Sequence, residues 1–287
     1  MSNRVNVLIG LAAVAVGFLL AGTAVAQISD EPDAEIEECL NEGKVVKKEG
    51  RLVGVTNPNR YKIECNGEER SVVFKHLDEH RRGVTRLPQG GSELNFSDSY
   101  KYEVAAYRLD RELGMNMVPV AVLRKVRGDH GCFVAWIDNA SNQKELAANP
   151  TGQQMAYLAG QKATMRLFDA LIYNTDRRPE NWMVNHDTFK LYLIDHSRAF
   201  RQDNELPESF ANRRTRLTSE LYEQLLKLNQ EELAEMLDGL ITNTQLEAML
   251  ERRDLIIGKI DKDRQEYGDA AIFSDWESSE AALEGNS

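Results

Sequence analysis

Two acidic residues and an asparagine stand close together in the stretch LIYNTDRRPENWMVNHDTFKLYLIDHSRAF, residues 171–200. Asp176 and Asn181 are five positions apart, and Asp195 follows at the end of a predicted hairpin. Enzymes that transfer a phosphoryl group place a carboxylate at the acceptor hydroxyl and an amide oxygen nearby for a metal ion. A second carboxylate can complete a site for Mg²⁺ or Mn²⁺, because hard cations prefer oxygen ligands. The spacing predicts that Asp176 is catalytic and that Asn181 and Asp195 bind the metal.

Basic residues that could complete such a site lie beside Asp176 and far upstream of it. Arg177 or Arg178 can meet the negative charge that develops on a transferred phosphate, and Arg177 is our candidate catalytic arginine. Lys75 ends a predicted strand, and Glu103 lies on the next predicted helix. A lysine held by a carboxylate is a fixed cation for nucleotide phosphates. This pair predicts a nucleotide-binding lobe ahead of the catalytic stretch.

Each of these residues also has a purely structural interpretation. By itself, Asp-Arg-Arg-Pro-Glu-Asn is a typical polar turn, and Asp195 could cap the segment that follows it. Lysines at strand ends, such as Lys75, are usually solvated. Asp110 and Glu112 lie on the same predicted helix as Glu103 and compete with it for the partnership with lysine. The order of the motifs along the chain favours the catalytic interpretation.

A predicted hairpin must position Lys75. In RYKIECNGEERSVVFK, residues 60–75, two runs of β-branched and aromatic residues flank Asn66-Gly67. This dipeptide is the strongest short signal for a two-residue hairpin loop. Such a loop pairs Tyr61 with Val72 and turns Lys75 to the face opposite Phe74, since neighbouring side chains in a strand alternate.

The elements that follow the hairpin carry Glu103 and complete the sheet. Residues 81–97 read as a loop, and SYKYEVAAYRLDREL (99–113) predicts a helix that ends at Gly114, with Ser97 or Asp98 as its N-cap. The runs VPVAVLRKV and GCFVAWI then predict a further pair of strands.

From Gly152 onward the pattern becomes helical. GQQMAYLAGQKATMRLFDALIY predicts a long helix, and residues 217–267 repeat Leu and Ile every three to four positions. The predicted fold class is α+β, with a β-rich lobe over 43–138, a linker over 139–151 and a mainly α-helical lobe over 152–267. The acidic residues 27–42 predict a flexible lead-in, and residues 268–287 an acidic tail.

The N-terminal residues predict export. Residues 1–26 combine Arg4, a long apolar stretch and Ala24-Val25-Ala26, which is the pattern of a secretory signal peptide. The destination would be a periplasm, the extracellular space or a secretory lumen. The apolar run is also long enough for an uncleaved single-span anchor, and only in that case do we expect a membrane association.

Charge and cysteine content restrict the partners and the cross-links. The net charge is -11, from 35 Lys and Arg against 46 Asp and Glu, which argues against a nucleic-acid partner. Cys39, Cys65 and Cys132 lie in what should be an oxidising compartment. They allow at most one intramolecular disulfide, in any of three pairings, and three unbridged thiols are an equal alternative.

These motifs together resemble a known group of kinases. NTDRRPENWMV followed by LYLIDHS resembles the catalytic and metal-binding segments of the phosphatidylinositol 3/4-kinase-like group. VVFK followed by YKYEVAAYRLDRELGMNMVP is similar to the small lobe of secretory-pathway kinases of the Fam20 type and their bacterial relatives. The resemblance covers roughly residues 50–260. It implies a two-lobed protein-kinase-like fold that uses ATP with Mg²⁺ or Mn²⁺.

The resemblance also assigns roles to single residues. It implies that Lys75 and Glu103 form the pair of the nucleotide lobe, that Asp176 is the catalytic carboxylate, and that Asn181 and Asp195 hold the metal. It makes the strand at 133–137 a hinge that meets adenine, so that the cofactor-binding residues would include Val134 and Trp136.

The sequence departs from the kinase pattern at three places. Arg178 stands where lipid kinases of the similar group often have His. Asp195-His196-Ser197 stands where protein kinases have Asp-Phe-Gly, and the only candidate for a glycine-rich loop, GVTNPN (54–59), has one glycine. The predicted activity is transfer of the γ-phosphate of ATP to a hydroxyl on a protein, a lipid or a sugar. The alternatives are a pseudokinase that binds nucleotide as a scaffold and a kinase-fold enzyme that transfers AMP.

Overall fold

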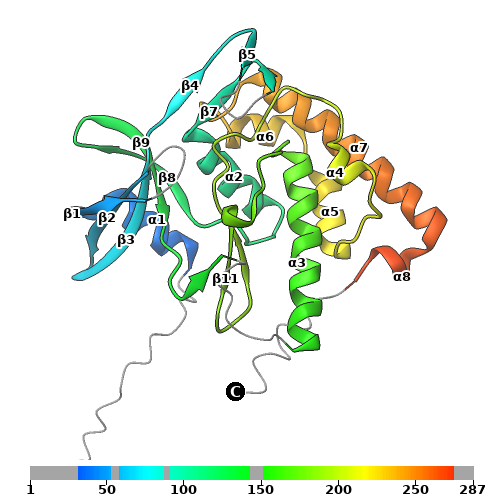
Figure 1. Ribbon diagram of the computed structural model, residues 1–287, viewed down its shortest axis with the longest axis horizontal. Helices are drawn as coiled ribbons and strands as arrows, with labels where there is room; N and C mark the ends of the chain where they lie inside the picture. Colours follow the sequence, from blue (N-terminus) through cyan, green and yellow to red (C-terminus); the bar gives the residue numbers. More distant parts are fainter. Residues whose placement is uncertain (1–31, 53–57, 87–90, 143–150, 275–287) are drawn as a thin grey trace, which may run out of the picture. The chain divides into compact units, whose positions relative to one another are not determined.

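The computed structural model describes residues 32–52, 58–86, 91–142 and 151–274, which belong to one compact unit. Figure 1 shows mainly strands in the first half of the chain and mainly helices in the second, as expected for an α+β fold. The predicted signal peptide or anchor lies outside the described ranges, as do residues 54–57 of the glycine-loop candidate. Within those ranges, no helix is both long enough and apolar enough to cross a membrane.

The β-rich lobe is built on a five-stranded antiparallel sheet in the order β1-β2-β3-β9-β8. The bounds of its strands are β1 Lys44–Arg51, β2 Asn59–Cys65, β3 Glu68–Lys75, β8 Ala121–Val126 and β9 Asp129–Ala135. The predicted hairpin is confirmed, because Tyr61 pairs with Val72 across β2 and β3. Asn66 and Gly67 have φ angles of 52° and 84°, the left-handed values that a type I′ turn requires.

Close packing fixes the end of β3 where Lys75 lies. Tyr61, Phe74 and Phe133 are buried and meet edge to face or at a tilt, with ring centroids 5.6–6.3 Å apart. A Cβ atom on Gly131 would lie 2.3 Å from the backbone oxygen of Lys75 and 2.6 Å from the Phe74 ring. Only glycine allows β9 to approach β3 this closely. The backbone at Lys75 is therefore held from the neighbouring strand.

Helix α2 (Lys101–Glu112) packs against this sheet, as predicted, but it begins differently. Its N-cap is Tyr100, whereas Ser97 and Asp98, the predicted caps, lie in a short strand, β7 (Ser97–Ser99), which pairs with β4 (Asp78–His80). The predicted loop at 81–97 also contains strands β5 (Val84–Arg86) and β6 (Ser92–Leu94). These strands are short and mostly polar, so no hydrophobic alternation indicates them.

The prediction of a flexible lead-in up to residue 42 is wrong for residues 33–42, which form helix α1 (Asp33–Glu42). Cys39 and Leu40 of this helix are buried in the core, and Cys39 is joined to Cys65 by a disulfide. Of the three possible pairings, the structure contains Cys39–Cys65, and Cys132 is a free buried thiol. Tertiary contacts and a cross-link therefore order a segment whose local sequence favours disorder.

The helical lobe begins with α3 (Gly152–Leu171), which Thr151 caps in a capping box with Gln154. A three-stranded sheet follows the order β10-β11-β12, with bounds β10 Ala140–Ser141, β11 Trp182–Asn185 and β12 Leu191–Leu193. The remaining helices are η1 Pro179–Asn181, α4 Glu208–Ala211, α5 Ser219–Lys227, α6 Gln230–Met236, α7 Asn243–Tyr267 and α8 Asp269–Ile272.

Two predicted segment boundaries differ in detail. Ala140 and Ser141, in the predicted linker, pair with β11, so the linker begins as part of a sheet. The predicted acidic tail contains α8, and Phe273 forms a parallel bridge with Leu217. Buried Ile272 explains this order, because an apolar side chain anchors the start of an otherwise acidic segment.

We expect the disulfide to contribute much of the stability of the β-rich lobe. Replacing both Cys39 and Cys65 by Ala should lower the free energy of unfolding by about 3 kcal/mol, since the bridge closes a 26-residue separation. Urea unfolding followed by circular dichroism would measure the loss. A reducing agent should destabilise the wild-type protein and leave the double variant unchanged. Equal sensitivity of both proteins to the reductant would contradict the pairing.

Candidate active site

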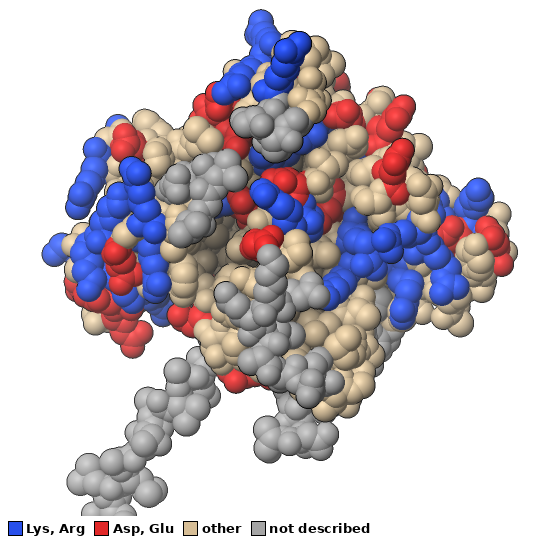
Figure 2. Space-filling model, in the orientation of Figure 1, with Lys and Arg blue, Asp and Glu red and all other residues tan. Residues whose placement is uncertain are grey.

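A cavity of about 410 Å³ lies between the five-stranded sheet and the β11–β12 hairpin. Six predicted site residues line it, namely Lys75, Glu103, Val134, Trp136, Asn181 and Asp195. Two other predicted residues, Asp176 and Arg177, are absent from the lining. Acidic and basic side chains meet at the centre of the face shown in Figure 2, between the β-rich and helical parts.

The Lys75 ammonium joins the two lobes. Its Nζ donates to Oε1 of Glu103 at 2.6 Å and to Oδ1 of Asp195 at 2.9 Å, across sequence separations of 28 and 120 residues. The side chains of Lys75 and Glu103 are only 13% and 3% exposed, whereas that of Asp195 is 41% exposed. Burial alone would lower the pKa of Lys75, but the Asp195 and Glu103 carboxylates outweigh it and raise the pKa. The lysine is a permanent cation.

Glu103 also holds the segment that carries Asp195. Its carboxylate accepts a hydrogen bond from the backbone N–H of His196 at 2.9 Å and lies 3.4 Å from Nδ1 of the same residue. Burial alone would raise the pKa of Glu103, but the Lys75 charge and the His196 hydrogen bond lower it to about 2. Burial lowers the pKa of His196, so the imidazole is neutral at pH 7. Glu103 therefore stays ionised at the centre of the site.

Asn181 and Asp195 offer oxygen atoms that suit a divalent metal ion. Nδ2 of Asn181 donates to the backbone oxygen of Asp176 at 2.8 Å, which leaves Oδ1 as the free end of the amide. Asp195 has a left-handed backbone, φ 63°, which is uncommon for a residue other than glycine. Among the described residues, no three His, Cys, Asp or Glu side chains form a metal site by themselves. An ion here would use Asn181, Asp195 and oxygens of a phosphate ligand.

Asp176 is hydrogen-bonded to two residues that line the cavity, Arg178 and Asn181. Its backbone N–H donates to Oδ1 of Asn174 at 3.2 Å, and its carboxylate lies 3.2 Å from the Arg178 guanidinium. The Asp176 side chain is half-buried, and Arg178 is largely exposed. An exposed ion pair of this kind is weak, so the carboxylate remains available to an incoming hydroxyl group.

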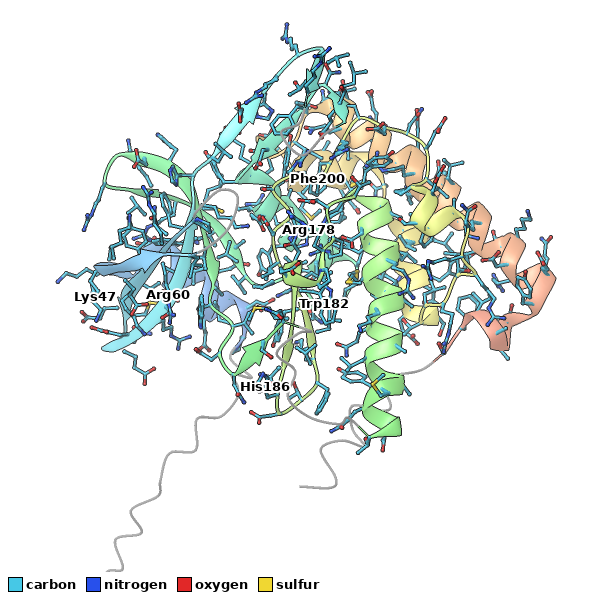
Figure 3. All side chains as sticks on the ribbon, in the orientation of Figure 1. Lys47, Arg60, Arg178, Trp182, His186 and Phe200 are labelled. Atoms are coloured by element: carbon cyan, nitrogen blue, oxygen red, sulfur yellow. A yellow bond between two sulfur atoms is a disulfide. The ribbon has the colours of Figure 1, made fainter. Side chains whose placement is uncertain are left out.

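The structure does not place Arg177 where a catalytic arginine would lie. Its guanidinium is 8% exposed and pairs with Asp169 at 2.9 Å. It also donates to the backbone oxygens of Ile194, at 2.7 Å, and Asn181. Arg177 thus holds the backbone at Asn181 and at Ile194, next to Asp195. Arg178, labelled in Figure 3, is the arginine that lines the cavity. Spacing alone cannot tell which of two adjacent arginines points inward.

The predicted hinge residues lie on the wall of the cavity, together with apolar residues that the sequence analysis did not select. Val134 and Trp136 are accompanied by the lining residues Met183 and Ile194. The two missed residues lie next to the predicted metal ligands, Met183 two positions after Asn181 and Ile194 one before Asp195. Apolar residues at these positions provide flat, dry surfaces that suit a planar ring such as adenine.

No protein-family model and no curated protein matches the sequence. Solved structures, however, match the fold. Hydra Fam20 with sugar superposes with a TM-score of 0.60 at 14% identity, over 86% of this chain and 93% of its own. The Golgi casein kinase gives 0.59 at 14% identity over 85% and 78%. The Golgi casein kinase with Mn/ADP bound gives 0.59 at 14% identity over 84% and 78%. The likeness establishes a two-lobed kinase-like fold, as predicted.

The depressed pKa of Glu103 predicts a loss of stability in acid. The folded-state pKa of about 2 lies below the ordinary value of 4.5, so this contribution is present above pH 4.5 and disappears as the pH falls toward 2. Its size is on the order of 3 kcal/mol. Glu103→Gln should therefore show a shallower loss of unfolding free energy between pH 5 and 2, measured by urea titration. Glu112→Gln, on the exposed face of α2, should keep the wild-type slope.

The buried position of Arg177 predicts a structural role. Arg177→Met should lower the free energy of unfolding by about 3 kcal/mol, because it leaves the Asp169 carboxylate buried without its partner. Arg178→Met, at the neighbouring exposed position, should change stability by less than about 0.5 kcal/mol. Thermal unfolding of both variants provides the comparison. Similar stabilities for the two variants would exclude the bracing role.

Proposed function

We propose that this chain is an exported atypical kinase that transfers the γ-phosphate of ATP to a hydroxyl group in a reaction dependent on Mg²⁺ or Mn²⁺. The observation that carries the proposal is the buried Lys75 ammonium, which bonds to Glu103 and Asp195 at the edge of a cavity that Asn181 also lines. The kinase-like fold supports it, as does the Mn/ADP bound to the Golgi casein kinase of similar fold. Export rests on the signal-peptide pattern of residues 1–26.

The donor capacity of Lys75 fits the binding of nucleotide phosphates. An ammonium group has three N–H donors, and two of them are used by Glu103 and Asp195. The third is free for a phosphate oxygen in the same cavity. Val134 and Trp136 line the part of the cavity where adenine would lie. A divalent ion held by Asn181 and Asp195 would neutralise charge on the phosphate oxygens.

Asp176 is the residue that handles the acceptor. Its carboxylate accepts the proton of the acceptor hydroxyl, and the acceptor oxygen forms a bond to the γ-phosphorus. The bond from this phosphorus to the β–γ bridging oxygen breaks, and ADP leaves with the electron pair. Arg178, at the cavity, is placed to meet the charge on the transferred group. A protein, a lipid and a sugar can each supply the hydroxyl.

Isotope labelling separates this function from the alternatives. The purified chain with Mn²⁺ or Mg²⁺ should transfer label from γ-labelled ATP, and not from α-labelled ATP, to an acceptor among candidate proteins, lipids and sugars. Asp176→Ala and Asp195→Ala should each reduce transfer by about 100-fold or more. Asp187→Ala, an exposed acid on the β11–β12 turn, should leave the rate unchanged.

Three outcomes would change the assignment. Transfer of the α label would identify an AMP-transferring enzyme. A rise in melting temperature with ATP and metal, with no labelled product, would identify a pseudokinase. An Asp195→Ala protein that labels acceptors at the wild-type rate would exclude the proposed mechanism.

A further inference from the structure

A third carboxylate lies close to the proposed metal site and lacks a partner on one side. Asp98 in β7 is 5% exposed, and its Oδ1 atom has no hydrogen-bond donor within the described residues. A buried carboxylate oxygen without a donor is costly, and native structures rarely keep one unless a water molecule or an ion completes it. We therefore expect a water molecule or an ion to bind the Oδ1 atom of Asp98.

The backbone and side chain of β7 attach Asp98 to the segment that carries Asp195. The N–H of Ser99 donates to the backbone oxygen of Ser197 at 2.8 Å. The Ser197 side chain lies on the same small cavity as the Asp98 carboxylate and lowers its pKa. Ser197 is the residue that stands where protein kinases have glycine. It links Asp98 to a position two residues from Asp195.

A small cavity adjoins both Asp98 and Lys75. It measures about 80 Å³, and its lining includes Asp98, Ser197 and Lys75. It shares Lys75 and Pro58 with the larger cavity that Asn181 and Asp195 line. A space of this size holds a few water molecules, and Asp98, Ser197 and Lys75 offer them polar partners on its wall. Water in this cavity could bridge the free Asp98 oxygen to an ion in the larger one.

The charges around these cavities favour a cation. Glu103, Asp195 and Asp98 bring three carboxylates, and Lys75 supplies one positive charge that two of them already share. Burial raises the pKa of Asp98, and the Asp195 charge raises it further, whereas Arg198 and Lys75 act in the opposite direction. Arg198 forms an ion pair with Glu93, so its charge is already balanced by another carboxylate. The site as a whole has an excess of negative charge that a divalent ion would balance.

We propose that Asp98 is an additional, water-mediated ligand of the divalent ion held by Asn181 and Asp195, and that Ser197 orients its carboxylate. The inference rests on the proposed metal-dependent phosphate transfer. Groups that contact metal ligands through a second layer of hydrogen bonds change metal affinity by about 10- to 100-fold when they are removed. Asp98 would belong to this second layer, and its removal should have an effect of that size on metal affinity.

Binding of Mn²⁺ to the full chain in the presence of ADP, followed by electron paramagnetic resonance, tests the proposal without requiring an acceptor. Asp98→Asn should weaken Mn²⁺ affinity by about 10-fold. Asp98→Glu, which keeps the charge, should recover part of the loss, and Ser197→Ala should give an intermediate loss. Glu79→Gln, which changes the residue paired with Asp98 across β4 and β7, is the matched control and should bind as the wild type does.

The outcomes distinguish this inference from the proposed function. If folded Asp98→Asn keeps the wild-type Mn²⁺ affinity while Asp195→Asn loses Mn²⁺ binding, the proposed role of Asp98 is wrong. The proposed function then still stands. Wild-type affinity in both variants would overturn the metal site itself. A melting temperature without Mn²⁺ is measured for each variant, because a purely structural Asp98 would lower that temperature without changing Mn²⁺ affinity. Should Asp98→Asn fail to fold, unchanged affinity in Ser197→Ala and Asp98→Glu would equally count against the proposal.

Discussion

The buried ammonium of Lys75 is the interaction on which the rest of the site depends. It is shared by Glu103 of α2 and Asp195 of the helical lobe, so three distant segments of the chain meet at one cation. Because both Lys75 and Glu103 are removed from water, neither can lose its partner cheaply. The close approach of Gly131 to the backbone of Lys75 keeps the strand that carries the cation in place. The sheet, helix α2 and the segment that carries Asp195 are thus joined at one buried cation.

A second buried ion pair does the same for the loop that carries Asn181. Arg177 is neutralised by Asp169 of α3 and uses its remaining donors on the backbone oxygens of Asn181 and Ile194. The backbone at Asn181 and at Ile194, the residue before Asp195, is therefore held by one buried guanidinium. The two ion pairs have different effects. The Lys75 pair joins the two lobes, and the Arg177–Asp169 pair holds the loop that carries Asn181. Both obey the same rule, that a buried charge must be paired and hydrogen-bonded.

Local patterns in the sequence predicted the central hairpin and helices α2 and α3, and six of the selected residues line one cavity. The Asn66-Gly67 turn fixes the register of the hairpin, and that register turns Lys75 toward Glu103, as predicted. Features that depend on contacts between distant segments could not be predicted from the sequence. Helix α1 depends on a disulfide and on burial against the sheet. Which of the side chains of Arg177 and Arg178 is buried depends on the partner Asp169. The polar strand β7 has no periodic signal. These features follow from tertiary contacts, which a local pattern does not contain.

The unusual Asp195-His196-Ser197 motif has a physical explanation in this fold. His196 is fully buried beside Phe168, with ring centroids 6.1 Å apart, and its backbone N–H is held by Glu103. Ser197 is held in turn by β7 through its backbone oxygen, and its side chain lies on the same small cavity as Asp98. Hydrogen bonds on both residues thus fix the segment behind Asp195. A glycine in place of Ser197 would free the backbone but remove the hydroxyl beside Asp98. Where protein kinases have glycine, this fold therefore has a serine side chain that lies beside the buried acidic residue Asp98.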